Sequence, residues 1–198
     1  MYGVIRQYEV DPNKKSEVFR RIIEGGVPII QAIPGFVSYT LVNGSNGAFL
    51  SVGFFDDQAG ADESTVRASA WVKDNLAPLL PAPPQIMAGE IRVRVITREP
   101  QFGVMRKYRV DAKNADTLIG RVRDEFLPMV SALPDFATYA LVDVGGGTLI
   151  GLNGFTTARG AAESSRVAAG WVKSRLSTLV PTPPEVVYGE IRHRVFVK

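Results

Sequence analysis

Apolar and polar positions along the chain alternate in short runs and change to helical spacing between them. Residues 4–10 alternate and are rich in β-branched and aromatic side chains, which predicts a strand that ends at Asp11-Pro12. Residues 14–32 place apolar side chains at helical spacing, with a break or kink expected at Gly25-Gly26 and Pro28. The later pattern predicts strands over 36–42 and 49–55, a helix over 60–80 and a last strand over 86–96.

The same pattern is written twice, because a shift of 100 positions aligns the chain with itself to its end without a gap. Arg6 and Tyr8 meet Arg106 and Tyr108, and Trp71-Val72-Lys73 meets Trp171-Val172-Lys173. We therefore expect two repeats, 1–99 and 100–198. Each has the order strand, helix, strand, strand, helix, strand, which is the split βαβ order of the ferredoxin-like α+β fold.

The predicted strands carry apolar side chains on both faces. Val4 and Tyr8 lie on one alternation set and Ile5 on the other, and Leu41 opposes Val42 in the same way. A four-stranded sheet with helices on one face leaves its other face bare, and an apolar bare face needs cover. We expect the two sheets to pack face to face, with a gain of roughly 25 cal/mol per Å² of buried apolar surface.

Composition narrows the function classes. The 198 residues are 45% hydrophobic and 22% charged, as in ordinary globular proteins, and include no cysteine, so disulfides, thiolate nucleophiles and zinc–thiolate or iron–sulfur sites are excluded. The net charge of +3 comes from scattered basic residues, so nucleic acid is not an expected partner. No apolar run approaches the roughly 20 residues of a membrane span, so no membrane partner and a cytoplasmic location are expected.

Two short motifs carry a resemblance to a known group. Ile33-Pro34-Gly35-Phe36 before the second strand, and Phe54-Phe55-Asp56-Asp57 after the third, resemble the antibiotic-biosynthesis-monooxygenase-like family of the dimeric α+β barrel superfamily. The resemblance covers both repeats. It implies an intrachain dimer, present as a monomer or as a homodimer of that unit, because family members dimerise through their sheets.

The resemblance also implies a range of activities. The group includes enzymes that oxidise polycyclic aromatic compounds with oxygen and without a cofactor, relatives that degrade haem, and members with no known activity. Their pockets lie between sheet and helices. The resemblance to the cofactor-free enzymes implies no cofactor or metal, and a small apolar or aromatic compound as the ligand. The helix histidine common in the oxygenase relatives is replaced by the stretch 61–64, Ala-Asp-Glu-Ser.

Arg6 with Tyr8, and Arg106 with Tyr108, are the candidate catalytic pairs. Residues two apart on a strand share a face, so a guanidinium and a phenol would meet in one cavity, where they could stabilise a phenolate or enolate. The alternative is structural: Arg6 pairs with Glu90 on a neighbouring strand, and Tyr8 packs in the core.

A second set of side chains lies at places comparable to substrate-binding positions of the group: Tyr39, Trp71, Arg94, Tyr139, Trp171, His193 and Arg194. The tryptophans are either aromatic walls for a flat ligand or ordinary helix core. His193 replaces Val93 of the first repeat, so it serves one repeat only, as a haem ligand or general base, or is a partly exposed strand residue.

Two functions stay open at this point. An oxygenase-like enzyme predicts an enclosed pocket larger than about 300 Å³ lined by the arginine and tyrosine side chains. A binding or stress-response protein would hold a small apolar molecule without turning it over.

Overall fold

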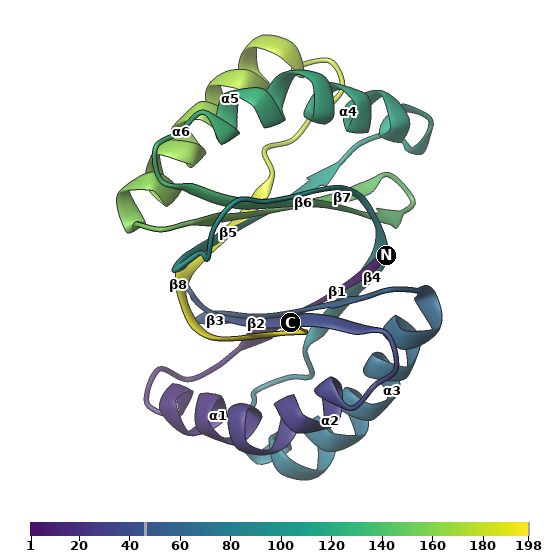
Figure 1. Cartoon of the computed structure of the whole chain (residues 1–198), viewed down its shortest axis with the longest axis vertical. Coiled ribbons are helices and arrows are strands. Elements are labelled where there is room, and N and C mark those ends of the chain that lie inside the picture. The colour runs from purple at the N-terminus through teal and green to yellow at the C-terminus, as the bar shows by residue number, and fades with distance from the viewer. Residues whose placement is uncertain (46, 198) are drawn as a thin grey trace. The chain divides into compact units, whose positions relative to one another are not determined.

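The computed structural model of the chain describes residues 1–45 and 47–197, so Asn46 and Lys198 of the two predicted repeats lie outside the described residues (Figure 1). The chain forms two compact units: residues 1–90 with 191–198, and residues 91–190. The boundary runs through the last strand of each sequence repeat, so each repeat gives the second half of that strand to the other unit.

The first unit contains the elements predicted for the first repeat. They are β1 (Tyr2–Glu9), α1 (Lys15–Arg21), a π-helical turn η1 (Ile22–Gly26), α2 (Val27–Gln31), β2 (Phe36–Gly44), β3 (Ala48–Phe55), α3 (Gln58–Asn75), a 3-10 turn η2 (Ala77–Leu79) and the first half of β4 (Gln85–Ile96). Strand β1 pairs antiparallel with both β3 and β4, and β3 pairs with β2. The helices cover one face of this sheet (Figure 1).

The second unit repeats this arrangement. It contains β5 (Phe102–Arg109), a 3-10 turn η3 (Ala112–Asn114), α4 (Ala115–Arg121), a π-helical turn η4 (Val122–Phe126), α5 (Leu127–Ser131), β6 (Phe136–Gly145), β7 (Thr148–Phe155), α6 (Ala158–Arg175) and the first half of β8 (Glu185–Phe196). Strand β5 pairs with β7 and β8, and β7 with β6, all antiparallel. Within the described residues, the strand order is β4-β1-β3-β2-β8 in the first unit and β8-β5-β7-β6-β4 in the second, where β4 and β8 each contribute one half to either unit. The predicted α+β class is confirmed.

The first helical segment is interrupted by a π turn in both units. The Val27 N–H donates to the Ile22 carbonyl, five residues back, and Leu127 and Val122 make the equivalent bond. The glycine pair is not its cause, because the second unit has Glu125 and Phe126 at these positions. A proline follows each π turn, at residue 28 or 128. Its missing N–H and its ring both disfavour an ordinary α-helical turn before it.

The second helix is shorter than the pattern predicts. Helices α3 and α6 end at Asn75 and Arg175, not near residue 80. A helix continued to residue 80 would leave only 81–84 to return the chain to β4 at Gln85. Each helix begins with a side-chain cap, since Asp57 accepts a hydrogen bond from the Gly60 N–H and Thr157 one from that of Gly160.

Both faces of each sheet are shielded from water, as the apolar alternation predicts. On the face away from the helices, Ile5, Val42 and Leu50 are at most 5% exposed, and so are Met105, Val142 and Ile150 in the second unit. On the other face, the strands and helices of each unit share one hydrophobic cluster. Any polar group found between helices and sheet is therefore desolvated.

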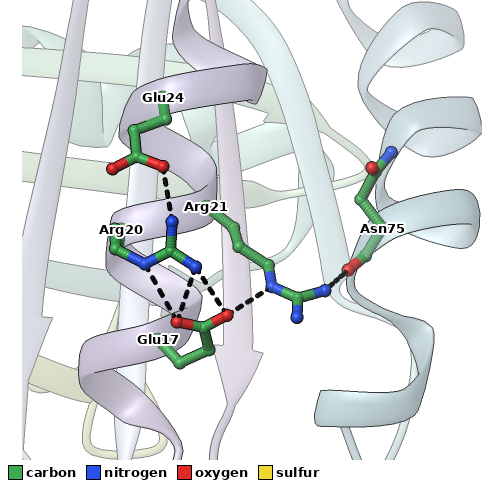
Figure 2. Close-up of polar contacts among 5 residues, drawn as sticks. All are labelled: Glu17, Arg20, Arg21, Glu24 and Asn75. Carbon is green, nitrogen blue, oxygen red and sulfur yellow. Dashed lines mark hydrogen bonds and ion pairs between the residues drawn. The ribbon is translucent and has the colours of Figure 1, made fainter.

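A surface arginine ties α1 to the end of α3. Arg21 donates to the Asn75 carbonyl at 2.9 Å and to Glu17, while the neighbouring Arg20 bridges Glu17 and Glu24 (Figure 2). The second unit keeps the inter-helix bond, from Arg121 to the Arg175 carbonyl. This bond satisfies a carbonyl at a helix end that has no partner within the helix.

Candidate functional site

One arginine in each unit lies buried between the sheet and the second helix. Arg6 on β1 is 1% exposed, and its Nη2 donates to the carbonyl of Ser64 at 2.9 Å and to the Ser64 hydroxyl at 2.8 Å. Arg106 on β5 is 2% exposed, and its Nη2 donates to the hydroxyls of Ser164 at 3.0 Å and Ser165 at 2.9 Å. Helices α3 and α6 therefore fix the orientation of the guanidinium groups.

Neither arginine has a carboxylate partner in the part of the chain that the structure describes. The structural alternative, an Arg6–Glu90 pair, is wrong, because the β1–β4 register places Glu90 opposite Tyr2 and Ile86 opposite Arg6. Nε and Nη1 of Arg6 and Nη1 of Arg106 are buried without a hydrogen-bond acceptor. Burial lowers the pKa of Arg106. A buried cation held only by neutral groups is costly, and an anion beside it would offset that cost.

Two tyrosines accompany each arginine. Tyr8 and Tyr39 in the first unit, and Tyr108 and Tyr139 in the second, are at most 7% exposed. Burial raises the pKa of all four hydroxyls, although the nearby guanidinium acts in the opposite direction. These phenols are therefore neutral at physiological pH and can donate hydrogen bonds. Tyr8 also packs as the structural alternative expects, stacked on Phe49 with ring centroids 4.2 Å apart.

An open cavity reaches the arginine in the second unit. Its volume is about 540 Å³, and its lining includes the side chains of Arg106, Tyr108 and Ser165. The walls are formed mainly by Val172, Val180, Val186 and the prolines of segment 181–184. Lys173 also lines it, so the described lining residues carry two cations and include no Asp, Glu or His. This composition favours an apolar ligand with an anionic group.

The first unit has a smaller cavity at the equivalent place. Its volume is about 310 Å³, and the described residues that line it do not include Arg6 or Tyr8. A separate void of about 20 Å³ touches Tyr8, Tyr39 and Trp71, which is room for about one water molecule. The two candidate catalytic pairs are thus buried alike. Among the cavities that the described residues line, the 540 Å³ cavity reaches the second pair, and the first pair meets the 20 Å³ void at Tyr8.

The two tryptophans pack differently. The Trp71 ring lies over the glycine pair, and a Cβ added at Gly25 would be only 3.0 Å from its Cζ2. Trp171 is 4% exposed, and its Nε1 donates to the Glu125 carboxylate at 3.1 Å, while its ring contacts Phe126. In the second unit the Phe126 ring fills the space between Trp171 and Tyr139, so Trp171 stands in the core and outside the cavity lining.

The remaining predicted residues lie outside the cavities beside α3 and α6. Arg94 is exposed on β4, and Arg194 on β8 stacks on the Phe196 ring, with its Cζ 5.3 Å from the ring centroid. His193 is partly buried on β8, and burial lowers its pKa. None of the three is among the described lining residues of the cavities beside α3 and α6.

Sequence reasoning overlooked the serines that hold the arginines. Ser64 and Ser164 are 0% exposed, and Ser164 lies on the same helix stripe as the buried Ala161, Ala168 and Trp171. A serine on an apolar stripe was the available signal, because a buried hydroxyl needs a partner.

The described residues offer neither a metal site nor a membrane-spanning helix. No group of three or more metal-binding side chains lies close enough together to hold a metal ion in residues 1–45 and 47–197. Within the same residues, no helix combines the length and the apolar character that crossing a membrane requires.

Solved structures share this fold at low sequence identity. A candidate monooxygenase from Fusobacterium nucleatum subsp. nucleatum matches with a TM-score of 0.76 and 8% identity, over 98% of this chain and 94% of that one. One from Lactobacillus acidophilus NCFM matches with a TM-score of 0.75 and 10% identity, over 98% and 95%. An anthrone oxidase-like protein matches with a TM-score of 0.70 and 13% identity, over 98% and 92%.

A scan against protein-family models finds no match, and neither does a search of curated proteins. The structural likeness covers nearly the whole chain, so it shows the dimeric α+β barrel fold. At these identities the likeness concerns the fold alone, and any function has to be argued from the site.

Proposed function

We propose that the second unit binds a small aromatic compound as its phenolate or enolate, and that the chain oxidises this compound with oxygen without a cofactor. One observation carries the proposal: the buried Arg106 lies at the inner end of a 540 Å³ apolar cavity, and its hydrogen-bond partners among the described residues are serine hydroxyls. The neighbours named as candidate monooxygenases and as anthrone oxidase-like support the reaction class.

The arrangement suits an oxyanion on an aromatic ring. The valine and proline walls would take up the ring, and the Arg106 guanidinium would stabilise the negative oxygen in a site of low dielectric constant. The neutral Tyr108 hydroxyl would donate a second hydrogen bond to that oxygen. Both interactions favour the ionised form of the substrate, which is the form that reacts with oxygen.

The reaction needs oxygen alone. The substrate first loses one proton of its reactive CH₂ group to solvent and becomes the enolate. The enolate gives one electron to O₂, and the radical and superoxide combine into a peroxide at that carbon, which keeps one hydrogen. The peroxide takes up a proton, and loss of water, with the remaining C–H hydrogen, leaves a carbonyl group. The sum is CH₂ + O₂ → C=O + H₂O, in which the carbon is oxidised and O₂ is reduced.

A second candidate function is binding without turnover, and the cavity lining favours it in one respect. The described lining residues include no carboxylate or imidazole, and Tyr108 is a donor because burial raises its pKa. The cavity therefore offers no ordinary general base, and a substrate would have to lose its proton to solvent.

Anthrone and 2-naphthoate, an aromatic anion at neutral pH, separate these functions. We expect calorimetry to show naphthoate binding that weakens at least tenfold in Arg106→Met and is unchanged in the matched control Arg6→Met, since the cavity does not reach Arg6. Uptake of one O₂ per anthrone, lost in Arg106→Met, would support the enzyme. Naphthoate binding without O₂ uptake would leave only the binding function, and no naphthoate binding by the unmodified protein would refute both.

A further inference from the structure

The two units have equivalent grooves, and the groove of the second unit extends deeper than that of the first. Every described lining residue of the 310 Å³ cavity has its counterpart, 100 positions later, in the lining of the 540 Å³ cavity. The larger cavity adds four residues at its inner end: Arg106, Tyr108, Ser165 and Ala168.

The inner end of the first unit has nearly the same chemistry. Arg6, Tyr8 and Ala68 match their counterparts, and only Thr65 differs, as the counterpart of Ser165. Arg6 is as deeply buried as Arg106 and also lacks a carboxylate. The polar groups therefore do not explain why a cavity reaches one arginine and stops short of the other.

At three paired positions the side chain of the second unit is smaller by one carbon, which leaves more room in its groove. Thr65, Leu80 and Ile86 of the first unit are Ser165, Val180 and Val186 in the second. Ile86 lies directly opposite Arg6 in the β1–β4 register, and Val186 lies opposite Arg106 in the β5–β8 register. Paired residues of an antiparallel ladder share a face, so the longer isoleucine lies beside the arginine that the groove fails to reach.

The arginine contacts differ at the first of these positions. Both hydroxyls donate to the carbonyl one helical turn back, Thr65 to Ala61 at 3.1 Å and Ser165 to Ala161 at 3.3 Å. The Ser165 hydroxyl also accepts from Arg106, whereas the Arg6 guanidinium donates within the described residues to Ser64. Three other lining differences remain. Ala77 to Ser177 and Ala82 to Thr182 add atoms in the second unit and so cannot enlarge its cavity, whereas Ser69 to Ala169 removes one hydroxyl oxygen at a position that is exposed in both units.

We infer that the residues at these three paired positions decide whether an aromatic anion reaches the buried arginine. Ser165, Val180 and Val186 hold the binding site of the second unit open. Thr65, Leu80 and Ile86 close a latent site for the same ligand class at Arg6. This inference rests on the proposed function, because it concerns the same cavity and the same anionic aromatic ligand.

Two triple variants test it with 2-naphthoate as the probe. The closing variant S165T/V180L/V186I carries only side chains that the first unit already accommodates at equivalent positions. We expect calorimetry to show one site per chain in the unmodified protein and at least tenfold weaker binding in the closing variant. In the opening variant T65S/L80V/I86V we expect two sites per chain, with the second lost when Arg6→Met is added.

The outcomes separate this inference from the proposed function. Absence of binding to the unmodified protein would refute the proposed function, and this inference with it. Binding to the unmodified protein with unchanged affinity in the closing variant, or a single site in the opening variant, would refute this inference alone. Thermal melting of each variant confirms that the protein is folded, and the two variants change different units, so either can decide the matter.

Discussion

Alkaline pH should unfold this protein through its four buried tyrosines. Burial raises the pKa of Tyr8, Tyr39, Tyr108 and Tyr139 in the folded state. In the unfolded chain each phenol ionises near its ordinary pKa of about 10. Because the folded state holds these protons at higher pH, their contribution to stability is complete below pH 10 and falls as the pH rises further.

The size of the effect follows from linkage. One pH unit above its ordinary pKa, each tyrosine that stays protonated only in the folded state costs about 1.4 kcal/mol of unfolding free energy. Four such residues cost about 6 kcal/mol by pH 11. That loss is comparable to the whole stability of many domains, about 5–15 kcal/mol.

Urea unfolding followed by circular dichroism, at steps between pH 8 and pH 12, measures this loss. We expect a flat stability up to about pH 9.5 and then a decline that steepens toward four protons per molecule. Tyr39→Phe and Tyr139→Phe should each lower the limiting slope by one proton. A slope of one proton or less would show that the four hydroxyls are not desolvated as described. So would tyrosinate absorbance at 295 nm that rises in the folded protein by more than the other two of the six tyrosines can contribute.

Three further predictions concern stability, measured by urea unfolding at pH 7. Arg6→Met and Arg106→Met each remove a buried charge that has no carboxylate partner. Each should therefore change the unfolding free energy by less than about 1 kcal/mol or raise it by up to about 3 kcal/mol. A loss above about 3 kcal/mol would contradict this expectation. Gly170→Ala, in the exposed middle of α6 with no atom within 4 Å of an added Cβ, should stabilise by about 1 kcal/mol, and a loss would indicate an overlooked contact. Phe126→Ala should cost about 3–5 kcal/mol because the ring is 3% exposed between Trp171 and Tyr139, and a cost below 1 kcal/mol would mean that the core closes around the gap.

The sequence alone was sufficient for most of the fold. Strand alternation placed β1 and the β2–β3 hairpin within about two residues of their observed bounds, because a half-buried strand must alternate. The helix interruption was also expected, at Gly25-Gly26 and Pro28, and the second unit separates these two causes, because its π turn contains Glu125 and Phe126 in place of the glycines. Both units keep the proline, so the proline and not the glycine pair accounts for the interruption.

The site was predictable only in part. The alternation rule put Arg6 and Tyr8 on one face, and the same rule applies to Arg106 and Tyr108. No local pattern could show which pair a cavity reaches, because that depends on side chains far away in sequence, such as Val180 and Val186. The serine partners on α3 and α6 were also missed, since helical periodicity alone does not reveal which strand residue faces a given helix position.

The repeat serves as an internal control for the functional argument. Both units keep a buried arginine beside two tyrosines, although a charge without a carboxylate partner contributes little to stability. A role of the arginine in folding alone does not explain why the cavity ends at the arginine in the second unit and stops short of it in the first. The first unit also gives its arginine a backbone carbonyl as an acceptor, from Ser64, whereas the acceptors of Arg106 within the described residues are hydroxyls. The cavity thus reaches Arg106, which is the arginine with the weaker acceptors. A negatively charged ligand beside Arg106 would supply a charged hydrogen-bond acceptor, which the serine hydroxyls are not.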